Sequence, residues 1–356
     1  MAQPPNVVFQ RGDRVPDFRL PDVSGAPTGP LLHSRGNPMV FAFSDAADDA
    51  TLQPFVDATD GFAGADVFLV TSQSAAANLA LARRFNLSFG VLSDPDGSVC
   101  RLFGFSGTGQ TDRRISVFAL DRNLRILDVV RSNDGAYSLD PVVTAIREAV
   151  PLPPPLPSPR PAPILLIPNV LDAKTCASFI ATWRKKGNIA SGTYDAQGNA
   201  DRGAGEQSSK ARRDHEVTDP KLKAVIGEMI GRRVAPEIQK AFDYQIVGTT
   251  LVKIARYGAD TGGFFRPHRD NTTPDAHHRR FALSLLLNDP ADSTGGGLRF
   301  AEYGPEVYYP PAGAALVFSG SLLHEVTPVT EGERFVLLTF LFGPREKEAL
   351  QKGANR

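Results

Sequence analysis

The segment VPLPPPLPSPRPAPI, residues 150–164, constrains the fold of this chain more than any other stretch. Proline fixes φ and lacks a backbone donor, so a run this dense cannot continue a helix. We expect an extended, semi-rigid spacer, and favour it over the alternative of a ligand for an SH3-type domain. A chain of 356 residues is also long for a single core. The sequence therefore predicts two domains, residues 1–149 and 165–356, joined by this linker.

Strand and helix patterns alternate in the first 149 residues. Short apolar runs predict strands, helical spacing of apolar residues predicts helices, and Asp121-Arg122-Asn123 fits a hairpin turn. The expected strands are 38–43, 67–71, 115–120 and 124–130, and the expected helices are 74–85 and 140–150. This order, βαβα followed by ββα, is typical of an α/β thioredoxin-like layer fold.

The same region resembles the peroxiredoxin branch of that fold. The likeness rests on GDRVPDFRLPDVSG at 12–25 and VLSDPDGSVCRLFGF at 91–105. Peroxiredoxins carry Pro-x-x-x-Thr-x-x-Cys after the first strand, because a helix N-terminus activates the thiolate there. The stretch 44–51 has no cysteine, and Cys100 lies where the family does not keep its nucleophile. We expect a redox-inactive domain that docks a substrate, mediates homo-oligomerisation or supports the second domain.

The second half is rich in strand patterns. TTLVKIARYG at 249–258 and FALSLLLND at 281–289 are strand candidates, and GGGLRFAEYG and EVYYPPAGAALVFSG supply further short strands and turns. This pattern predicts an antiparallel sheet closing into a barrel with a site at its mouth. A helix is expected after Asp172, its N-cap. One face of that helix carries Cys176, Phe179, Ile180 and Trp183.

Four residues of this half point to a particular chemistry. His268 and Asp270 lie in GGFFRPHRDN, and His324 and Arg334 lie in LLHEVTPVTEGERFVLLTFLF. Two histidines and one carboxylate can occupy one face of an octahedral metal and leave the other face open, as non-haem Fe(II) oxygenases require. A guanidinium in the next expected strand can hold a carboxylate bidentately. Together the four residues predict an Fe(II) site with an anchored dicarboxylate cosubstrate.

From about residue 165 to 343 the chain resembles the 2-oxoglutarate- and Fe(II)-dependent dioxygenases, in their prolyl-4-hydroxylase-like branch. Besides the four residues above, the likeness rests on Tyr257 before the His-x-Asp, on residues 296–300 (a Gly-Gly segment shifted by one) and on residues 311–318. The resemblance implies a double-stranded β-helix, or jelly-roll, barrel with supporting helices.

The resemblance also implies a role for each site residue. Fe(II) would be bound by His268, Asp270 and His324, which are then the catalytic residues. The C5 carboxylate of 2-oxoglutarate would pair with Arg334, with a hydrogen bond from Tyr257 nearby. The reaction would use O2, release succinate and CO2 and hydroxylate a C–H bond, with ascorbate as a supporting reductant.

Each of these side chains could have a structural role instead. His268 could be a surface histidine and His324 a hydrogen-bonded core histidine. Arg334 could cap the Gly332 turn, and Tyr257 could serve packing. For Tyr257 the two interpretations are balanced, and the adjacent His277 and His278 fit a solvated loop better than a functional pair. For the whole chain, the alternatives are a thiol peroxidase with an accessory barrel and a non-catalytic binding protein. The missing cysteine in 44–51 opposes the first, and the intact set of four residues opposes the second.

Charge and composition limit the partners. The chain has 39 basic and 39 acidic residues, so a nucleic-acid partner is not expected. Its two cysteines, Cys100 and Cys176, exclude a disulfide framework. No signal core and no run of transmembrane length occur, so we expect a cytoplasmic protein away from membranes.

The substrate is the least constrained feature. The resembling branch hydroxylates prolyl residues in peptides and proteins, while similar barrels act on small molecules. The glycine-rich, charged segment 195–217 is an expected lid over the site. Its Arg212 and Arg213 are candidate substrate contacts, although a solvated loop is the favoured interpretation for each.

Overall fold

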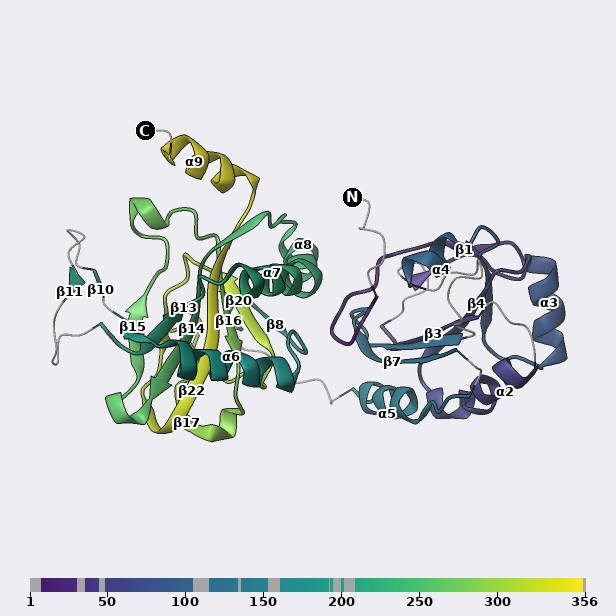
Figure 1. Cartoon of the computed structure of the whole chain (residues 1–356). Helices are drawn as coiled ribbons and strands as arrows, with labels where there is room; N and C mark the ends of the chain where they lie inside the picture. The colour runs from purple at the N-terminus through teal and green to yellow at the C-terminus, as the bar shows by residue number, and fades with distance from the viewer. Residues whose placement is uncertain are drawn as a thin grey trace. The chain divides into compact units, whose positions relative to one another are not determined.

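A computed structural model of the chain divides it into two compact units, Met1–Pro155 and Leu156–Arg356. The structure describes residues 8–30, 36–44, 49–104, 115–133, 136–152, 161–191, 193–194, 200–201 and 209–354. Within the expected linker 150–164, residues 153–160 lie outside this described part. Figure 1 draws the helices and strands of both units, and among the described residues each cluster of buried apolar side chains falls within one unit.

The N-terminal unit is built on a five-stranded sheet in the order β5-β4-β3-β6-β7. Strands β3 to β5 are parallel, and β6 and β7 join them antiparallel. Their bounds are β3 Met39–Ser44, β4 Asp66–Thr71, β5 Gly90–Ser93, β6 Ile115–Leu120 and β7 Ile126–Ser132; a separate pair is β1 Leu20–Pro21 and β2 Pro27–Thr28. Every residue of β3 and β6 is buried, which explains why MVFAFS and ISVFAL are continuous rather than alternating apolar runs.

Helices cover both faces of this sheet. They are α2 Asp49–Asp57, α3 Ala75–Arg84, α4 Ser98–Leu102 and α5 Asp140–Ala149, with a 3-10 turn at Thr59–Phe62. Cys100 of α4 packs on one face, and Leu81 of α3 and Ile146 of α5 pack on the other. The predicted thioredoxin-like order is confirmed, and β5 and α4 are added between its two halves. The four residues of β5 were too few to show a period of their own.

The C-terminal unit contains two antiparallel sheets. The larger has the order β8-β20-β16-β22-β14-β13-β9, with β17 also paired to β22, and the smaller has the order β12-β15-β21-β18-β19. The larger sheet comprises β8 Ile164–Ile167, β9 Ile189–Ala190, β13 Arg213–Glu216, β14 Gly248–Gly258, β16 Phe281–Leu286, β17 Ser293–Gly295, β20 Ala315–Ser319 and β22 Val329–Phe342. The smaller comprises β12 Lys210–Ala211, β15 Phe264–His268, β18 Leu298–Arg299, β19 Val307–Tyr308 and β21 His324–Val326; β10 Thr193–Tyr194 and β11 Ala200–Asp201 form a separate pair.

Side-chain alternation along the larger sheet separates two cores. In β16, Leu283 and Leu285 face a core shared with helices, while Ala282 and Leu286 face a core shared with the smaller sheet. The helices are α6 Ala173–Lys186, α7 Pro220–Met229, a π-helical turn Ile230–Val234, α8 Ala235–Phe242 and α9 Pro344–Ala354; 3-10 turns lie at Ala259–Thr261, Pro274–Ala276 and Pro290–Asp292. The larger sheet is therefore covered by helices on one side and by the smaller sheet on the other.

Helix α6 forms as the sequence predicts. Asp172 is its N-cap and accepts a hydrogen bond from Thr175 N at 2.7 Å. Cys176, Phe179 and Trp183 are buried on its inner face. Cys100 and Cys176 are both buried, and neither forms a disulfide with a described residue. Among the described residues, none of the helices is long and apolar enough to cross a membrane.

Candidate functional site

Three side chains able to ligate a metal meet where two strands of the smaller sheet pair. His268 ends β15 and His324 begins β21, and the antiparallel register places these residues opposite each other. Nε2 of His268 lies 3.5 Å from Asp270 Oδ1, and Nε2 of His324 lies 3.5 Å from Asp270 Oδ2. One ligand atom from each residue lies within 4.8 Å of the others, so a single ion can contact all three.

Backbone hydrogen bonds determine which nitrogen of each imidazole faces Asp270. Nδ1 of His268 lies 2.8 Å from Arg266 O, and Nδ1 of His324 lies 3.0 Å from Leu322 O. A carbonyl oxygen can only accept, so Nδ1 carries the proton and Nε2 presents its lone pair. Both histidines are therefore held in the tautomer that leaves Nε2 free for a metal.

The charge states at this point also suit a divalent cation. Burial alone would raise the pKa of Asp270, but its contact with His268 and the nearby charge of Arg279 hold that pKa below its usual value. Burial lowers the pKa of the His324 imidazole and favours its neutral form. Oδ2 of Asp270 is buried and accepts no hydrogen bond from any described residue. A carboxylate oxygen and two imidazole nitrogens that converge in this way fit a divalent metal ion.

A glycine allows the loop of Asp270 to approach the end of β20. Asp270 N donates to Gly320 O at 2.8 Å, and Gly320 N donates to Arg280 O at 3.0 Å. A Cβ placed on Gly320 would lie 2.4 Å from Arg279 O and 3.5 Å from the Cβ of Asp270. Any side chain at this position would push the loop away, so Gly320 sets where the carboxylate stands.

Arg334 carries a second buried polar atom without a hydrogen-bond partner among the described residues. It lies on β22 opposite Tyr257 of β14, and its guanidinium carbon is 5.3 Å from the centre of the Tyr257 ring. The side chain is buried, Nη2 lies 3.4 Å from Ser284 Oγ, and Nη1 is without a hydrogen-bond partner in the described part of the chain. Gly296, at φ +75°, leaves room for it, since a Cβ there would lie 3.0 Å from Arg334 Cδ. A buried cation with an open donor is the complement of a carboxylate.

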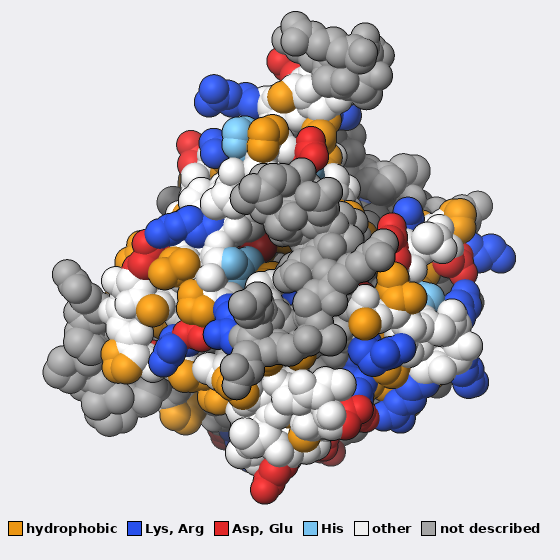
Figure 2. Space-filling view, turned by 90° about the vertical axis from the view of Figure 1, so that its left-hand side faces the viewer, with side chains coloured by type: hydrophobic (Ala, Val, Ile, Leu, Met, Phe, Trp, Pro, Cys, Tyr) orange, Lys and Arg blue, Asp and Glu red, His pale blue; other side chains and the backbone are white. Residues whose placement is uncertain are grey.

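One cavity of about 580 Å³ contains both the three ligands and Arg334. Its wall includes Tyr257 and Ser284 from the larger sheet and Phe265 from the smaller one, so it lies between the two sheets. A volume of this size accommodates a small molecule. Figure 2 looks onto the side of the molecule that carries β15, where basic side chains and a histidine are exposed. The structure thus brings together all five predicted site residues, including Tyr257.

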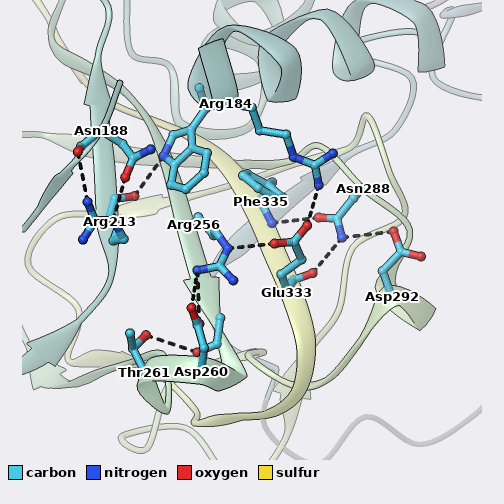
Figure 3. A network of polar contacts seen from close by, with 12 residues as sticks. Arg184, Asn188, Arg213, Arg256, Asp260, Thr261, Asn288, Asp292, Glu333 and Phe335 are labelled. Carbon is cyan, nitrogen blue, oxygen red and sulfur yellow. Dashed lines mark hydrogen bonds and ion pairs between the residues drawn. The ribbon is translucent and has the colours of Figure 1, made fainter. Parts of the chain in front are cut away.

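The backbone on both sides of Arg334 is held by Asn288, just beyond β16 (Figure 3). Oδ1 of Asn288 accepts from Phe335 N at 2.7 Å, and Nδ2 donates to Glu333 O at 2.9 Å and to Asp292 Oδ2 at 3.1 Å. An amide side chain can donate and accept at once, so Asn288 provides the hydrogen bonds to β22 that the backbone of β16 would make if that strand were longer. The sequence reasoning missed Asn288, because nothing local connects it with a residue 46 positions later.

The side chain of Glu333 fastens the same point to neighbouring elements. It accepts from Arg184 Nη2 of α6 at 2.5 Å and from Arg256 Nε of β14 at 2.7 Å. Figure 3 shows these ion pairs and the Asn288 contacts as one network, and neither Glu333 nor Asn288 lines the cavity. Glu333 and Asn288 therefore fix the strand from outside, while Arg334 points inward.

Arg212 differs from its favoured interpretation as a solvated loop residue. Its side chain is largely buried and lines the cavity. Nε and Nη2 donate to the two carboxylate oxygens of Asp214 at 2.8 and 2.9 Å, and Nη1 donates to the Tyr257 hydroxyl at 3.2 Å. Arg213 instead donates to Asn188 Oδ1 at 2.5 Å and is not part of the cavity wall.

The remaining candidates do not line the cavity, or they fall partly outside the residues that the structure describes. His277 and His278 do not line the cavity; His278 Nε2 lies 3.1 Å from Thr250 Oγ1, and burial lowers the pKa of His278. Of the expected lid, residues 195–199 and 202–208 lie outside the described residues, and 210–216 include β12 and β13.

Comparison with known proteins gives one family match. Residues 252–342, which include all five site residues, match the family model of the 2OG-Fe(II) oxygenase superfamily. A PKHD-type hydroxylase, PiuC of Pseudomonas aeruginosa, is 29% identical over 145 residues, covering 37% of this chain and 61% of that protein. The chain spans less than two thirds of the length of the curated relatives first matched.

Solved structures resemble each unit separately. A prolyl-4-hydroxylase from Pseudomonas putida has a TM-score of 0.37 and 22% identity, covering 51% of this chain and 93% of that one. The peroxidoxin BcpB from Mycobacterium tuberculosis has a TM-score of 0.34 and 24% identity, covering 39% of this chain and 97% of that one.

Proposed function

We propose that this chain, which carries a domain of the 2OG-Fe(II) oxygenase superfamily over residues 252–342, is a hydroxylase that depends on Fe(II), O2 and 2-oxoglutarate. Its substrate would be a C–H bond in a peptide, a protein (a prolyl residue among the candidates) or a small molecule. One observation carries the proposal. A His-Asp-His set with free acceptor atoms shares a cavity with a buried guanidinium that has an open donor.

Each site residue has a defined task in this proposal. His268, Asp270 and His324 would hold Fe(II), and the tautomers fixed by their backbone contacts need no rearrangement to do so. Arg334 would bind and orient the C5 carboxylate of 2-oxoglutarate, with Tyr257 packed against its guanidinium. When bound, Fe(II) and 2-oxoglutarate supply the oxidising chemistry that hydroxylates the substrate and yields succinate and CO2. The protein binds, orients and encloses the reactants.

The proposal extends to the fold of the C-terminal unit. Two facing antiparallel sheets with the ligands between them are the arrangement expected of a double-stranded β-helix. We assign the hydroxylase to this unit and a redox-inactive supporting role to the N-terminal one.

A direct assay tests the proposal. The protein supplied with Fe(II), 2-oxoglutarate and ascorbate should form succinate, and omission of Fe(II) should stop it. Adding a library of prolyl peptides and metabolites should give a product heavier by one oxygen, detected by mass spectrometry. A protein that binds neither Fe(II) nor 2-oxoglutarate would rule the assignment out.

The N-terminal unit should not reduce hydrogen peroxide faster than an unrelated protein with two buried thiols. Cys100 is buried in α4, and its backbone N–H donates to Asp94 Oδ2 at 2.7 Å, so the thiol is shielded from solvent and a carboxylate nearby opposes a thiolate. Cys100→Ser should leave succinate formation nearly unchanged. Rapid peroxide reduction that disappears in Cys100→Ser would favour the thiol-peroxidase alternative.

Asn288→Ala should raise the apparent constant for 2-oxoglutarate about three- to tenfold, because Arg334 loses the clamp on its strand. It should also lower the free energy of unfolding by about 1–3 kcal/mol, since Phe335 N and Glu333 O each lose a partner. Asp292→Ala is the matched control, as it removes the third contact of Asn288 and leaves both backbone bonds. A loss of stability with no change in the 2-oxoglutarate constant would leave Asn288 a purely structural role.

A further inference from the structure

Arg212 connects the two sheets at the cavity. It lies between β12 of the smaller sheet and β13 of the larger one. Its guanidinium carbon is 5.9 Å from the centre of the Tyr257 ring on β14 and 5.5 Å from the centre of the Phe265 ring on β15. The side chain is 9% exposed and lines the same cavity as Arg334. A buried guanidinium needs a counter-charge and acceptors for its donors, and the contacts of Arg212 supply both.

Asp214 fixes the direction in which the Arg212 guanidinium points. Nε and Nη2 of Arg212 donate to the two oxygens of this carboxylate at 2.8 and 2.9 Å, in the bidentate geometry that a planar guanidinium favours. The third nitrogen, Nη1, therefore faces away from Asp214 and lies 3.2 Å from the Tyr257 hydroxyl. The pairing with Asp214 thus determines which atom of Arg212 reaches Tyr257.

The hydrogen bond between Arg212 and Tyr257 can have only one direction. A guanidinium has donors and no acceptor, so the hydroxyl oxygen of Tyr257 accepts and its own proton must point elsewhere. Tyr257 is 1% exposed, and the described residues provide no acceptor for that proton. A buried donor without an acceptor is unfavourable, so we expect a bound ligand to provide the acceptor.

Tyr257 and the open donor of Arg334 belong to the same part of the cavity. The two residues pair across β14 and β22, and the guanidinium carbon of Arg334 is 5.3 Å from the centre of the Tyr257 ring. Both side chains line the cavity, and Nη1 of Arg334 has no hydrogen-bond partner among the described residues. A carboxylate has two oxygens with several lone pairs, so a single carboxylate can accept from both donors.

Resting on the proposed function, we propose that Arg212 is a positioning residue for 2-oxoglutarate: it holds the Tyr257 hydroxyl as a donor, and Tyr257 and Arg334 together bind the C5 carboxylate. Arg212 acts through Tyr257 and does not itself touch the cosubstrate. Without Arg212 the hydroxyl could rotate and accept as well as donate, so fewer of its orientations would suit a carboxylate. With Arg212 in place, the donor is oriented before the cosubstrate binds.

A double-mutant cycle on 2-oxoglutarate binding tests this role. The full-length protein is loaded with Mn(II) and titrated with 2-oxoglutarate by calorimetry. Tyr257→Phe removes the hydroxyl and should weaken binding about tenfold. Arg212→Lys keeps a cation beside Asp214 but cannot pair with both of its oxygens and reach Tyr257 at once, so it should weaken binding about three- to tenfold. The double variant should bind within about twofold of Tyr257→Phe, because the effect of Arg212 passes through the hydroxyl.

Arg213→Lys is the matched control, because this neighbouring arginine donates to Asn188 and does not line the cavity. It should bind 2-oxoglutarate like wild type, and the Mn(II) affinity should be nearly unchanged in every variant. Should Arg212→Lys not fold, Asp214→Asn loosens the same guanidinium and should follow the same cycle. Losses that multiply in the double variant, or no loss in Arg212→Lys, would overturn the role of Arg212. Failure of the wild-type protein to bind 2-oxoglutarate would overturn the proposed function, and this inference with it.

Discussion

Asp270→Ala should abolish hydroxylation and weaken Fe(II) binding by orders of magnitude, while the protein stays folded. Three ligands hold a labile divalent ion only weakly, and the carboxylate is the one charged member of the set. Oδ2 of Asp270 has no hydrogen bond to lose among the described residues, but the carboxylate loses its contact with His268 and the nearby charge of Arg279. The metal-free variant should therefore stay folded, with a free energy of unfolding somewhat below that of the metal-free wild type at neutral pH.

Thermal unfolding with and without metal measures this effect. Fe(II), or Mn(II) as an air-stable substitute, at about 100 times its dissociation constant should stabilise the wild-type protein by about 2.7 kcal/mol. The same concentration should barely shift the unfolding of Asp270→Ala. Asp275→Ala, an exposed carboxylate five residues away, should keep the full shift. Wild-type turnover by Asp270→Ala would place the metal elsewhere.

Arg334→Ala should raise the apparent constant for 2-oxoglutarate by a factor of roughly 30 or more and leave Fe(II) affinity nearly unchanged. Removing one partner of a buried charge-assisted pair costs about 2–5 kcal/mol. Arg334→Lys should recover part of the loss, because the charge remains but the planar fork does not. Arg299→Ala, whose guanidinium pairs with Glu325 on the smaller sheet, is the matched control.

Replacing Arg334 weakens 2-oxoglutarate binding, but it should not lower the stability of the protein when 2-oxoglutarate is absent. The guanidinium of Arg334 is buried, Nη2 donates to the Ser284 hydroxyl, and Nη1 has no hydrogen-bond partner in the described part of the chain. Burial lowers the pKa of Arg334, which reflects the cost of keeping this charge away from water. Arg334→Met without 2-oxoglutarate should therefore unfold at the wild-type temperature or above. If Arg334→Ala binds 2-oxoglutarate like wild type, the anchor moves to another cation, with Lys253, Arg279 and Arg280 as the next candidates.

Much of the fold follows from local signals. The buried strands β3 and β6 are continuous apolar runs, and Asp172 begins a helix because its carboxylate can accept the free N–H of Thr175. The short strand β5 and the helix α4 were missed, since four or five residues carry too little periodicity.

The sequence by itself determined which residues are the candidates for the site. His268, Asp270, His324 and Arg334 were identified by residue type and spacing, because metal and carboxylate binding need particular functional groups. Tyr257 was identified by its place before the His-x-Asp, although local pattern alone could not separate packing from function.

Only the tertiary structure decided how these groups are supported and what surrounds them. Pairing of β15 with β21 aligns the two histidines, and Asn288 reaches across 46 residues of sequence to hold the strand of Arg334. Arg212, which fits a solvated loop in the sequence, is buried because it donates to the hydroxyl of Tyr257, 45 residues later in the chain, as well as to Asp214. Such contacts join residues far apart in the chain, and no local pattern encodes the distance at which two charges will finally meet.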